Sequence, residues 1–189
     1  RLDTFFFFLD VMLTIYAQIT TRCNMTCPHC LFSCGETGVD MPLGMFKSLC
    51  EDLKGLGIEP FMLLGGGEPT LHGDLFEMIA IAHEAGISLS TIVNGVETEK
   101  TLALLRDKRI TTYLSWDAFH DRSKVAGNVY RAAAARNVLW RKSTNTFFKV
   151  GRGAKLAEHK PEAALDLEEF SEDDVNPVLR VDPNGVIYK

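Results

Sequence analysis

Short apolar runs alternate with stretches of helical periodicity through most of the chain. In residues 46–56 the apolar positions recur at spacings of three and four, which places them on one face of a helix. Residues 61–64 (Phe-Met-Leu-Leu) form an unbroken apolar run, as in strands that are buried on both faces of a sheet. The alternation of these two patterns predicts an α/β fold with a mainly parallel sheet covered by helices.

The same reasoning places further elements along the chain. The predicted strands are 13–20, 61–64, 87–93, 111–115 and 146–150. The predicted helices are 46–56, 74–82, 98–106 and 129–140, the second with the start signal of Asp74 followed by Glu77. At the end of the chain, residues 178–188 predict two short strands around the turn sequence Asp182-Pro-Asn-Gly185.

Two segments depart from this rhythm. Residues 1–11 contain four consecutive phenylalanines, but Asp10 interrupts the apolar run and no small-residue cleavage site follows. We therefore interpret 1–11 as a non-native or disordered leader, and 12–189 as a single domain. Residues 156–176 hold eight acidic residues and one lysine, which is more negative charge than the net −5 of the whole chain. This segment is predicted to be an acidic loop or lid.

Composition narrows the functional classes. A chain of 189 residues with 46% hydrophobic and 24% charged residues is ordinary for one globular domain. The net charge of −5 offers no general basic surface for nucleic acid. No apolar run reaches the roughly 18 residues that a membrane span needs, so no membrane association is expected. The count of five cysteines excludes a complete set of internal disulfides, and three of them fall within eight residues.

Those three cysteines stand in the sequence Cys23-Asn-Met-Thr-Cys27-Pro-His-Cys30, directly after the first predicted strand. Ligands bind at the carboxyl ends of parallel strands, where this loop is expected to lie. Thiolates favour zinc or iron–sulfur clusters. One hypothesis is therefore a zinc-binding interaction module with His29 or Cys34 as the fourth ligand. The other is a four-iron cluster, in which three cysteines leave one iron with an open position.

The CxxxCxxC loop resembles the signature of the radical S-adenosylmethionine (radical SAM) enzymes, and Gly66-Gly-Glu-Pro69 resembles their GGEP motif. Each motif follows a predicted strand, in the family's order. The resemblance covers roughly residues 13–155. It extends through three further strand ends, which read Asn94-Gly95, Leu114-Ser-Trp-Asp-Ala-Phe-His-Asp121 and Gly151-Arg-Gly-Ala-Lys155.

The resemblance implies a fold and a chemistry. The family core is a partial, TIM-like open barrel. The chain supplies five strand–helix units, with 178–181 as the only sequence left for a sixth, so a (β/α)5–6 barrel with a short C-terminal hairpin is expected. A complete eightfold barrel needs about 250 residues. In the family, the three cysteines hold a 4Fe-4S cluster whose open iron chelates SAM. Reductive cleavage of SAM then gives a 5′-deoxyadenosyl radical that abstracts hydrogen from substrate.

The resemblance also assigns roles to individual residues. Cys23, Cys27 and Cys30 take the cluster-ligand positions, and His29 takes the position that lies against the adenine of SAM. Glycines allow a ligand to approach the backbone closely, and Glu68 can accept a charge-assisted hydrogen bond from the ammonium group of SAM. The full set of candidate cofactor-binding residues is His29, Gly66, Gly67, Glu68, Asn94, Ser115, Asp117 and Arg152.

Several questions stay open at this stage. The substrate is predicted only as a peptide, a nucleotide-derived compound or a small metabolite. An electron donor such as flavodoxin or ferredoxin, and a reducing cytoplasmic location, are expected for such a cluster. A degenerate relative that binds SAM without turnover is a further alternative. Cys50 is predicted to pack in the core and Cys34 to lie near the cluster, while His72 and His120 are interpreted as surface histidines.

Overall fold

An open seven-stranded sheet with the order β5-β4-β3-β2-β1-β8-β9 forms the centre of the described part of the chain. The computed structural model describes residues 13–56, 59–140, 147–148, 152, 154–155, 158, 164–165 and 178–188. Neighbouring strands from β5 to β8 are parallel, and β9 runs antiparallel to β8. Six parallel strands in an open sheet confirm the predicted α/β class.

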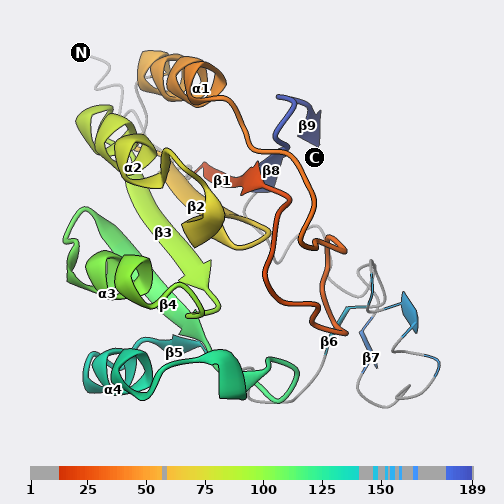
Figure 1. Ribbon diagram of the computed structural model, residues 1–189. Helices are drawn as coiled ribbons and strands as arrows, with labels where there is room; N and C mark the ends of the chain where they lie inside the picture. Colours follow the sequence, from red (N-terminus) through yellow and green to blue (C-terminus); the bar gives the residue numbers. More distant parts are fainter. Residues whose placement is uncertain are drawn as a thin grey trace, which may run out of the picture.

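The elements follow one another as strand and helix until β5. Their bounds are β1 Thr14–Thr20, α1 Leu43–Gly55, β2 Phe61–Gly66, α2 Leu75–Glu84, β3 Ser88–Val93, α3 Thr98–Arg106, β4 Ile110–Ser115, α4 Gly127–Ala135 and β5 Leu139–Trp140. Two short 3-10 turns, Pro69–Leu71 and Arg122–Lys124, follow β2 and β4. Because β1 to β5 are neighbours in chain order and such crossovers are right-handed, helices α1 to α4 lie on one face of the sheet (Figure 1).

The core lies between this helical layer and the sheet. The central strands contribute side chains such as Ile15, Met62 and Leu64, each at most 1% exposed. The helices contribute Phe46 and Cys50, which are equally buried. Cys50 therefore packs in the core, as its position on the apolar helix face predicts.

The first sequence error concerns the fifth strand. The helix predicted over 129–140 is too long, because α4 ends at Ala135 and the fifth strand of the main sheet is β5, which pairs with β4 at residues 139–140. Asn137 has a φ of 55°, and the amides of Asn137 and Val138 bond back to Ala134 and Ala133, which is a Schellman termination. Within 146–150 only 147–148 are described. They form β6 (Phe147–Phe148), which pairs with β7 (Ala164–Leu165) in a separate two-stranded sheet.

The sixth strand is present, in the segment left for it by the sequence. β8 (Val178–Val181) pairs in parallel with β1, at the edge of the sheet opposite β5. The predicted hairpin is confirmed: β9 (Ile187–Tyr188) returns antiparallel to β8. Its turn is held by Asp182, whose Oδ1 accepts hydrogen bonds from the amides of Asn184 (2.9 Å) and Val186 (3.0 Å).

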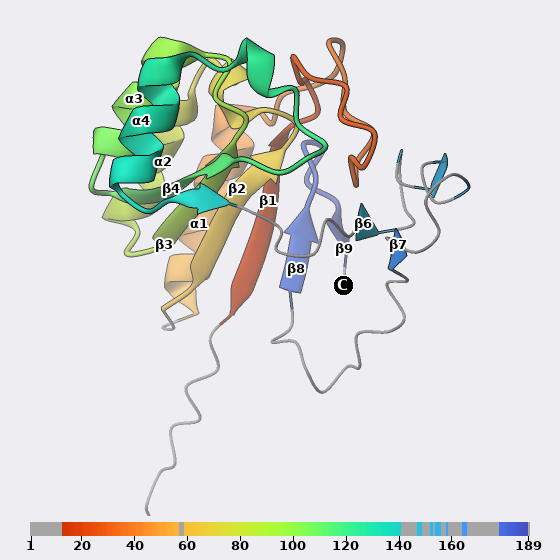
Figure 2. The same cartoon turned by 90° about the horizontal axis from the view of Figure 1, so that it is seen from below.

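All strand ends that carry candidate residues lie at one end of the sheet. Figure 2 shows the long loop after β1, in orange, beyond the arrowheads of the parallel strands. The base of this loop is tied by Thr21 N to Val39 O (2.9 Å) and Met41 N to Ile19 O (2.8 Å). An ion pair between Arg22 and Asp40 closes it further.

Some expectations fall on residues outside the described set. The leader at 1–11 lies wholly outside it, and the acidic segment 156–176 is described only at 158 and 164–165. The single-domain boundary at residue 12 therefore stays a prediction. Among the described residues, none of the helices has the length and apolar character that crossing a membrane requires.

Candidate active site

A cavity of about 290 Å³ opens at the carboxyl ends of the strands. Its walls come from the loop after β1 and from the ends of β2, β3 and β4, with Arg152 and Trp140 completing them. Every candidate site residue from the sequence lines this one cavity. They are Cys23, Cys27, His29, Cys30, Gly66, Gly67, Glu68, Asn94, Ser115, Asp117 and Arg152.

The spacing of the cysteine sulfurs can be compared with the two metal hypotheses. A tetrahedral zinc ion with Zn–S bonds of about 2.3 Å places its sulfurs about 3.8 Å apart. In the part of the chain that the structure describes, no three cysteine sulfurs lie within 4.8 Å of one another. A four-iron cluster is a larger body whose cysteine sulfurs stand further apart. The three half-buried cysteines line one cavity, which gives them a common space for a metal centre.

Each of the three sulfurs has a polar neighbour. Asn94 Nδ2 lies 3.9 Å from Cys23 Sγ. Cys27 is within hydrogen-bonding reach of His120, and Cys30 is within hydrogen-bonding reach of Cys34.

The thiols of Cys23, Cys30 and Cys34 differ in the direction or cause of their pKa shifts. Burial raises the pKa of Cys23 to about 11. The hydrogen bond with Cys34 lowers the pKa of Cys30 and outweighs burial there, while it raises the pKa of Cys34. Cys34 itself is 4% exposed and lines the cavity, so it lies beside the ligand set as predicted.

The glycines after β2 make room for the chain that leaves β1. Gly66 has a φ of 104°, and its amide donates to the hydroxyl of Tyr16 at 2.7 Å. A Cβ on Gly67 would lie closer than 3.0 Å to the carbonyl group of Arg22. Because glycine has no side chain, these two positions leave space for the backbone at the end of β1, in addition to any ligand.

Glu68 ties the end of β2 to the end of β3. Its side chain is buried, with Oε1 accepting from Thr70 N (3.1 Å) and Thr70 Oγ1 (2.5 Å), and Oε2 accepting from Asn94 N (2.7 Å). Burial is the largest influence on this carboxyl and raises its pKa. A carboxylate oxygen can accept two hydrogen bonds, so Oε2 keeps capacity for one more donor in the cavity.

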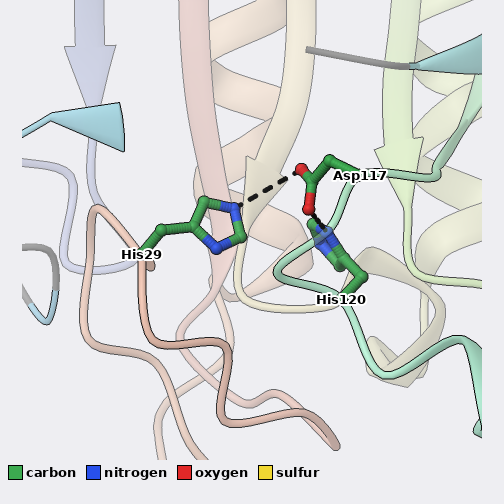
Figure 3. A group of neighbouring side chains, drawn as sticks. All are labelled: His29, Asp117 and His120. Atoms are coloured by element: carbon green, nitrogen blue, oxygen red, sulfur yellow. Dashed lines mark hydrogen bonds and ion pairs between the residues drawn. The ribbon is translucent and has the colours of Figure 1, made fainter. Parts of the chain in front are cut away.

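Asp117 organises two histidines in the cavity wall. His120 Nδ1 lies 2.7 Å from Oδ1, and His29 Nε2 lies 3.6 Å from Oδ2. Figure 3 shows both rings turned toward this carboxylate. Burial opposes charge on either partner, yet the hydrogen bond between them lowers the pKa of Asp117 to about 2. With help from Cys27 it raises the pKa of His120 to about 9.

The interpretation of His72 and His120 as surface histidines is wrong. His120 lines the cavity. His72 is 2% exposed, accepts a hydrogen bond from Asp74 N at Nδ1 (3.0 Å) and therefore donates from Nε2 to Met41 O (3.0 Å). His72 has a structural role, at the start of α2, whose N-cap residue Asp74 makes no side-chain capping bond.

Arg152 reaches the cysteine loop from far along the chain. Its Nε donates to Cys27 O (2.8 Å), its Nη1 to Cys34 O (2.6 Å), and its backbone amide to Cys30 O (3.0 Å). Nη2 is buried and has no hydrogen-bond partner among the described residues. Two guanidinium nitrogens and the backbone amide of Arg152 therefore hold the loop. Ser115, at the end of β4, pairs with Trp140 of β5 and lines the cavity.

Comparison with known proteins identifies the family. The model of the Radical SAM superfamily matches residues 17–151. The chain belongs to the radical SAM superfamily.

The chain is similar to the S-adenosylmethionine-dependent nucleotide dehydratase of Selenomonas ruminantium, with 36% identity over 78 residues, 41% of this chain and 28% of that protein. It is also similar to mycofactocin maturase MftC of Mycolicibacterium smegmatis, with 32% identity over 98 residues, 50% of this chain and 24% of that protein. The chain thus matches about a quarter of the length of these relatives. The solved structure of BtrN in complex with AdoMet and 2-DOIA shares the fold, with a TM-score of 0.56, 18% identity, and coverage of 94% of this chain and 72% of that chain.

Sequence reasoning missed two residues that line the cavity and one that contacts its wall. Tyr16 supports the glycine loop, Asn24 hydrogen-bonds Asn94, and His120 pairs with Asp117. His120 carried a usable signal, since it stands three residues after a candidate carboxylate in a loop. Tyr16 and Asn24 depend on contacts 50 and 70 residues apart in the chain, which no local pattern encodes.

Proposed function

We propose that this chain cleaves SAM reductively and directs the resulting radical to a substrate hydrogen. The observation that carries the proposal is the convergence of all eleven candidate residues, from five chain segments, on one cavity. When bound, a 4Fe-4S cluster supplies the electron that splits SAM into methionine and a 5′-deoxyadenosyl radical. Transfer of a substrate hydrogen atom to that radical would give 5′-deoxyadenosine and a substrate radical.

The chain's own residues would hold and orient the reactants. Cys23, Cys27 and Cys30 would supply three thiolates to hold such a cluster. The spare acceptor capacity of Glu68 Oε2 suits an ammonium group, and the unpartnered Nη2 of Arg152 suits a carboxylate. These two groups match the charged ends of the methionine part of SAM.

The remaining cavity residues suit the nucleoside part. His29 offers a flat ring against which adenine can lie, and Asp117 sets the orientation of that ring. Ser115 and Asp117, two residues apart at the end of β4, can meet ribose hydroxyl groups. The substrate is proposed only as a peptide, a nucleotide-derived compound or a small metabolite. The electron donor is proposed as a flavodoxin or ferredoxin in a reducing cytoplasmic compartment.

The test is release of 5′-deoxyadenosine by anaerobically reconstituted protein with SAM and dithionite. We expect wild type to release it and Cys27→Ala to fall to the level of a protein-free blank. Cys50→Ala is the matched control, because that cysteine is buried in α1 away from the cavity. Release by Cys27→Ala at the wild-type rate would refute the assignment of the loop.

A further inference from the structure

Asn94 lies between the cysteine loop and the end of β3, and its amide contacts a cluster-ligand sulfur. Nδ2 is 2.7 Å from Asn24 Oδ1 and 3.9 Å from Cys23 Sγ. The residue is 6% exposed, and its backbone amide is fixed by Glu68 at 2.7 Å. A side chain held so closely has little freedom to turn away from the sulfur.

The hydrogen-bond network determines which end of the amide faces Cys23. The Val96 amide can only donate, and it bonds Asn94 Oδ1 at 3.0 Å, so Oδ1 points away from the sulfur. From the other side, Glu97 accepts from Asn24 Nδ2 at 3.3 Å, which turns Asn24 Oδ1 toward Asn94. Both ends of the network give the same orientation of the Asn94 amide.

Nδ2 carries two hydrogens, and the network uses only one of them. Asn24 Oδ1 takes the first, and the second is directed at Cys23 Sγ. A donor to a sulfur ligand interacts more strongly when the cluster gains an electron and its sulfurs become more negative. Such outer-shell donors therefore favour the reduced state.

We propose that Asn94 is a positioning residue for the cluster: its Nδ2–H donates to the Cys23 sulfur and raises the reduction potential, and the relay Glu97–Asn24 holds it in that orientation. This inference rests on the proposed function, since it presupposes a cluster on Cys23. It goes beyond that function because it names the group that makes reduction of the cluster easier.

The test is an EPR-monitored redox titration of the reconstituted protein without SAM. Asn94→Leu removes the donor without adding charge, and Asn94→Asp removes it while keeping an oxygen for the Val96 amide. The matched control is Asn128, an exposed asparagine whose Oδ1 accepts from Val129 N at 3.0 Å, changed to Leu and Asp in the same way. If Asn94 had a role in folding alone, its substitution would change the melting temperature or the iron content. The midpoint potential of the remaining cluster would then be unchanged.

We expect both Asn94 variants to shift the midpoint potential to more negative values and both Asn128 variants to keep it. Unchanged potentials in Asn94→Leu and Asn94→Asp, with iron content equal to wild type, would overturn the inference. If neither Asn94 variant holds a cluster, Asn24→Ala decides, because it keeps Asn94 and removes the acceptor that orients it. A smaller shift in the same direction supports the relay, and no shift overturns it.

Failure of the proposed function is distinguishable from failure of this inference. Wild-type protein that takes up no iron would refute the proposed function. Wild-type protein with a reducible cluster, whose potential does not depend on Asn94 or Asn24, would refute only the relay.

Discussion

Gly67→Ala is expected to damage both the fold and the cluster site. The new Cβ would lie closer than 3.0 Å to the carbonyl carbon and oxygen of Arg22, a distance that real Cβ contacts do not show. The clash cannot be relieved by a rotamer change, because both partners are backbone. They are also held in place, by Gly67 N to Thr20 O (2.7 Å) and Glu68 N to Arg22 O (2.8 Å).

The size of the effect follows from these contacts. Overpacking of a fixed site costs about 1 to 3 kcal/mol of unfolding free energy. Loss of one of the two backbone hydrogen bonds adds about 0.5 to 1.5 kcal/mol. A total of about 1.5 to 4.5 kcal/mol corresponds to a fall in melting temperature of about 3 to 18 °C for a domain of this size. Because Arg22 directly precedes Cys23, the same displacement should lower iron uptake.

Thermal unfolding and iron analysis of the variant test this expectation. Gly73→Ala is the matched control, since a Cβ there meets no atom within 4 Å. We expect Gly73→Ala to melt and to bind iron like wild type, and Gly67→Ala to fall in both. Equal melting temperatures and iron contents for the two variants would refute the close approach of the strand ends that the structure shows.

Two further changes probe the cavity wall. Tyr16→Phe should lower the unfolding free energy by about 1 to 3 kcal/mol, because the Gly66 amide loses its acceptor. Urea denaturation measures this loss. A loss below about 0.5 kcal/mol would contradict the expectation. His120→Gln in cluster-free protein should have a pH-dependent effect. The folded pKa of His120, about 9, exceeds its ordinary 6.5, so pairing with Asp117 stabilises the fold fully below pH 6.5 and that contribution is lost as pH rises through 9. The variant should therefore be less stable than wild type by a larger margin near about pH 6 than near about pH 10. An equal margin at both pH values would argue against the pair.

Local patterns in the sequence were sufficient for the repeating part of the fold. Apolar runs such as 61–64 and the helical spacing in 46–56 lie within single elements, so each can be recognised without its neighbours. Parallel strands then bring their carboxyl ends together, which is why residues as distant as Cys23 and Asp117 could be expected at one cavity.

The errors arise where structure depends on a single residue or on distant contacts. Asn137 ends α4 by adopting a positive φ, but the alanine-rich run before it continued to favour a helix as far as Trp140. β5 has two residues, which is too short for a periodic signal. The pairing of β8 with β1 joins segments more than 150 residues apart, and no local pattern specifies it.

The burial of the two histidines also depends on distant contacts that local sequence does not encode. A histidine in a loop gives no sign of whether tertiary contacts will bury it. His120 becomes part of the cavity only because Asp117 and Cys27 are beside it, and His72 becomes part of the core because Met41 accepts its hydrogen bond.

The EPR spectrum of the anaerobically reconstituted, dithionite-reduced protein, with and without SAM, tests most directly whether the chain holds a cluster that binds SAM. We predict a 4Fe-4S signal from about four irons per chain, a shift of that signal when SAM is added, and its loss in Cys27→Ala. Stoichiometric zinc without iron after anaerobic purification, or a cluster signal that SAM leaves unchanged, would contradict it.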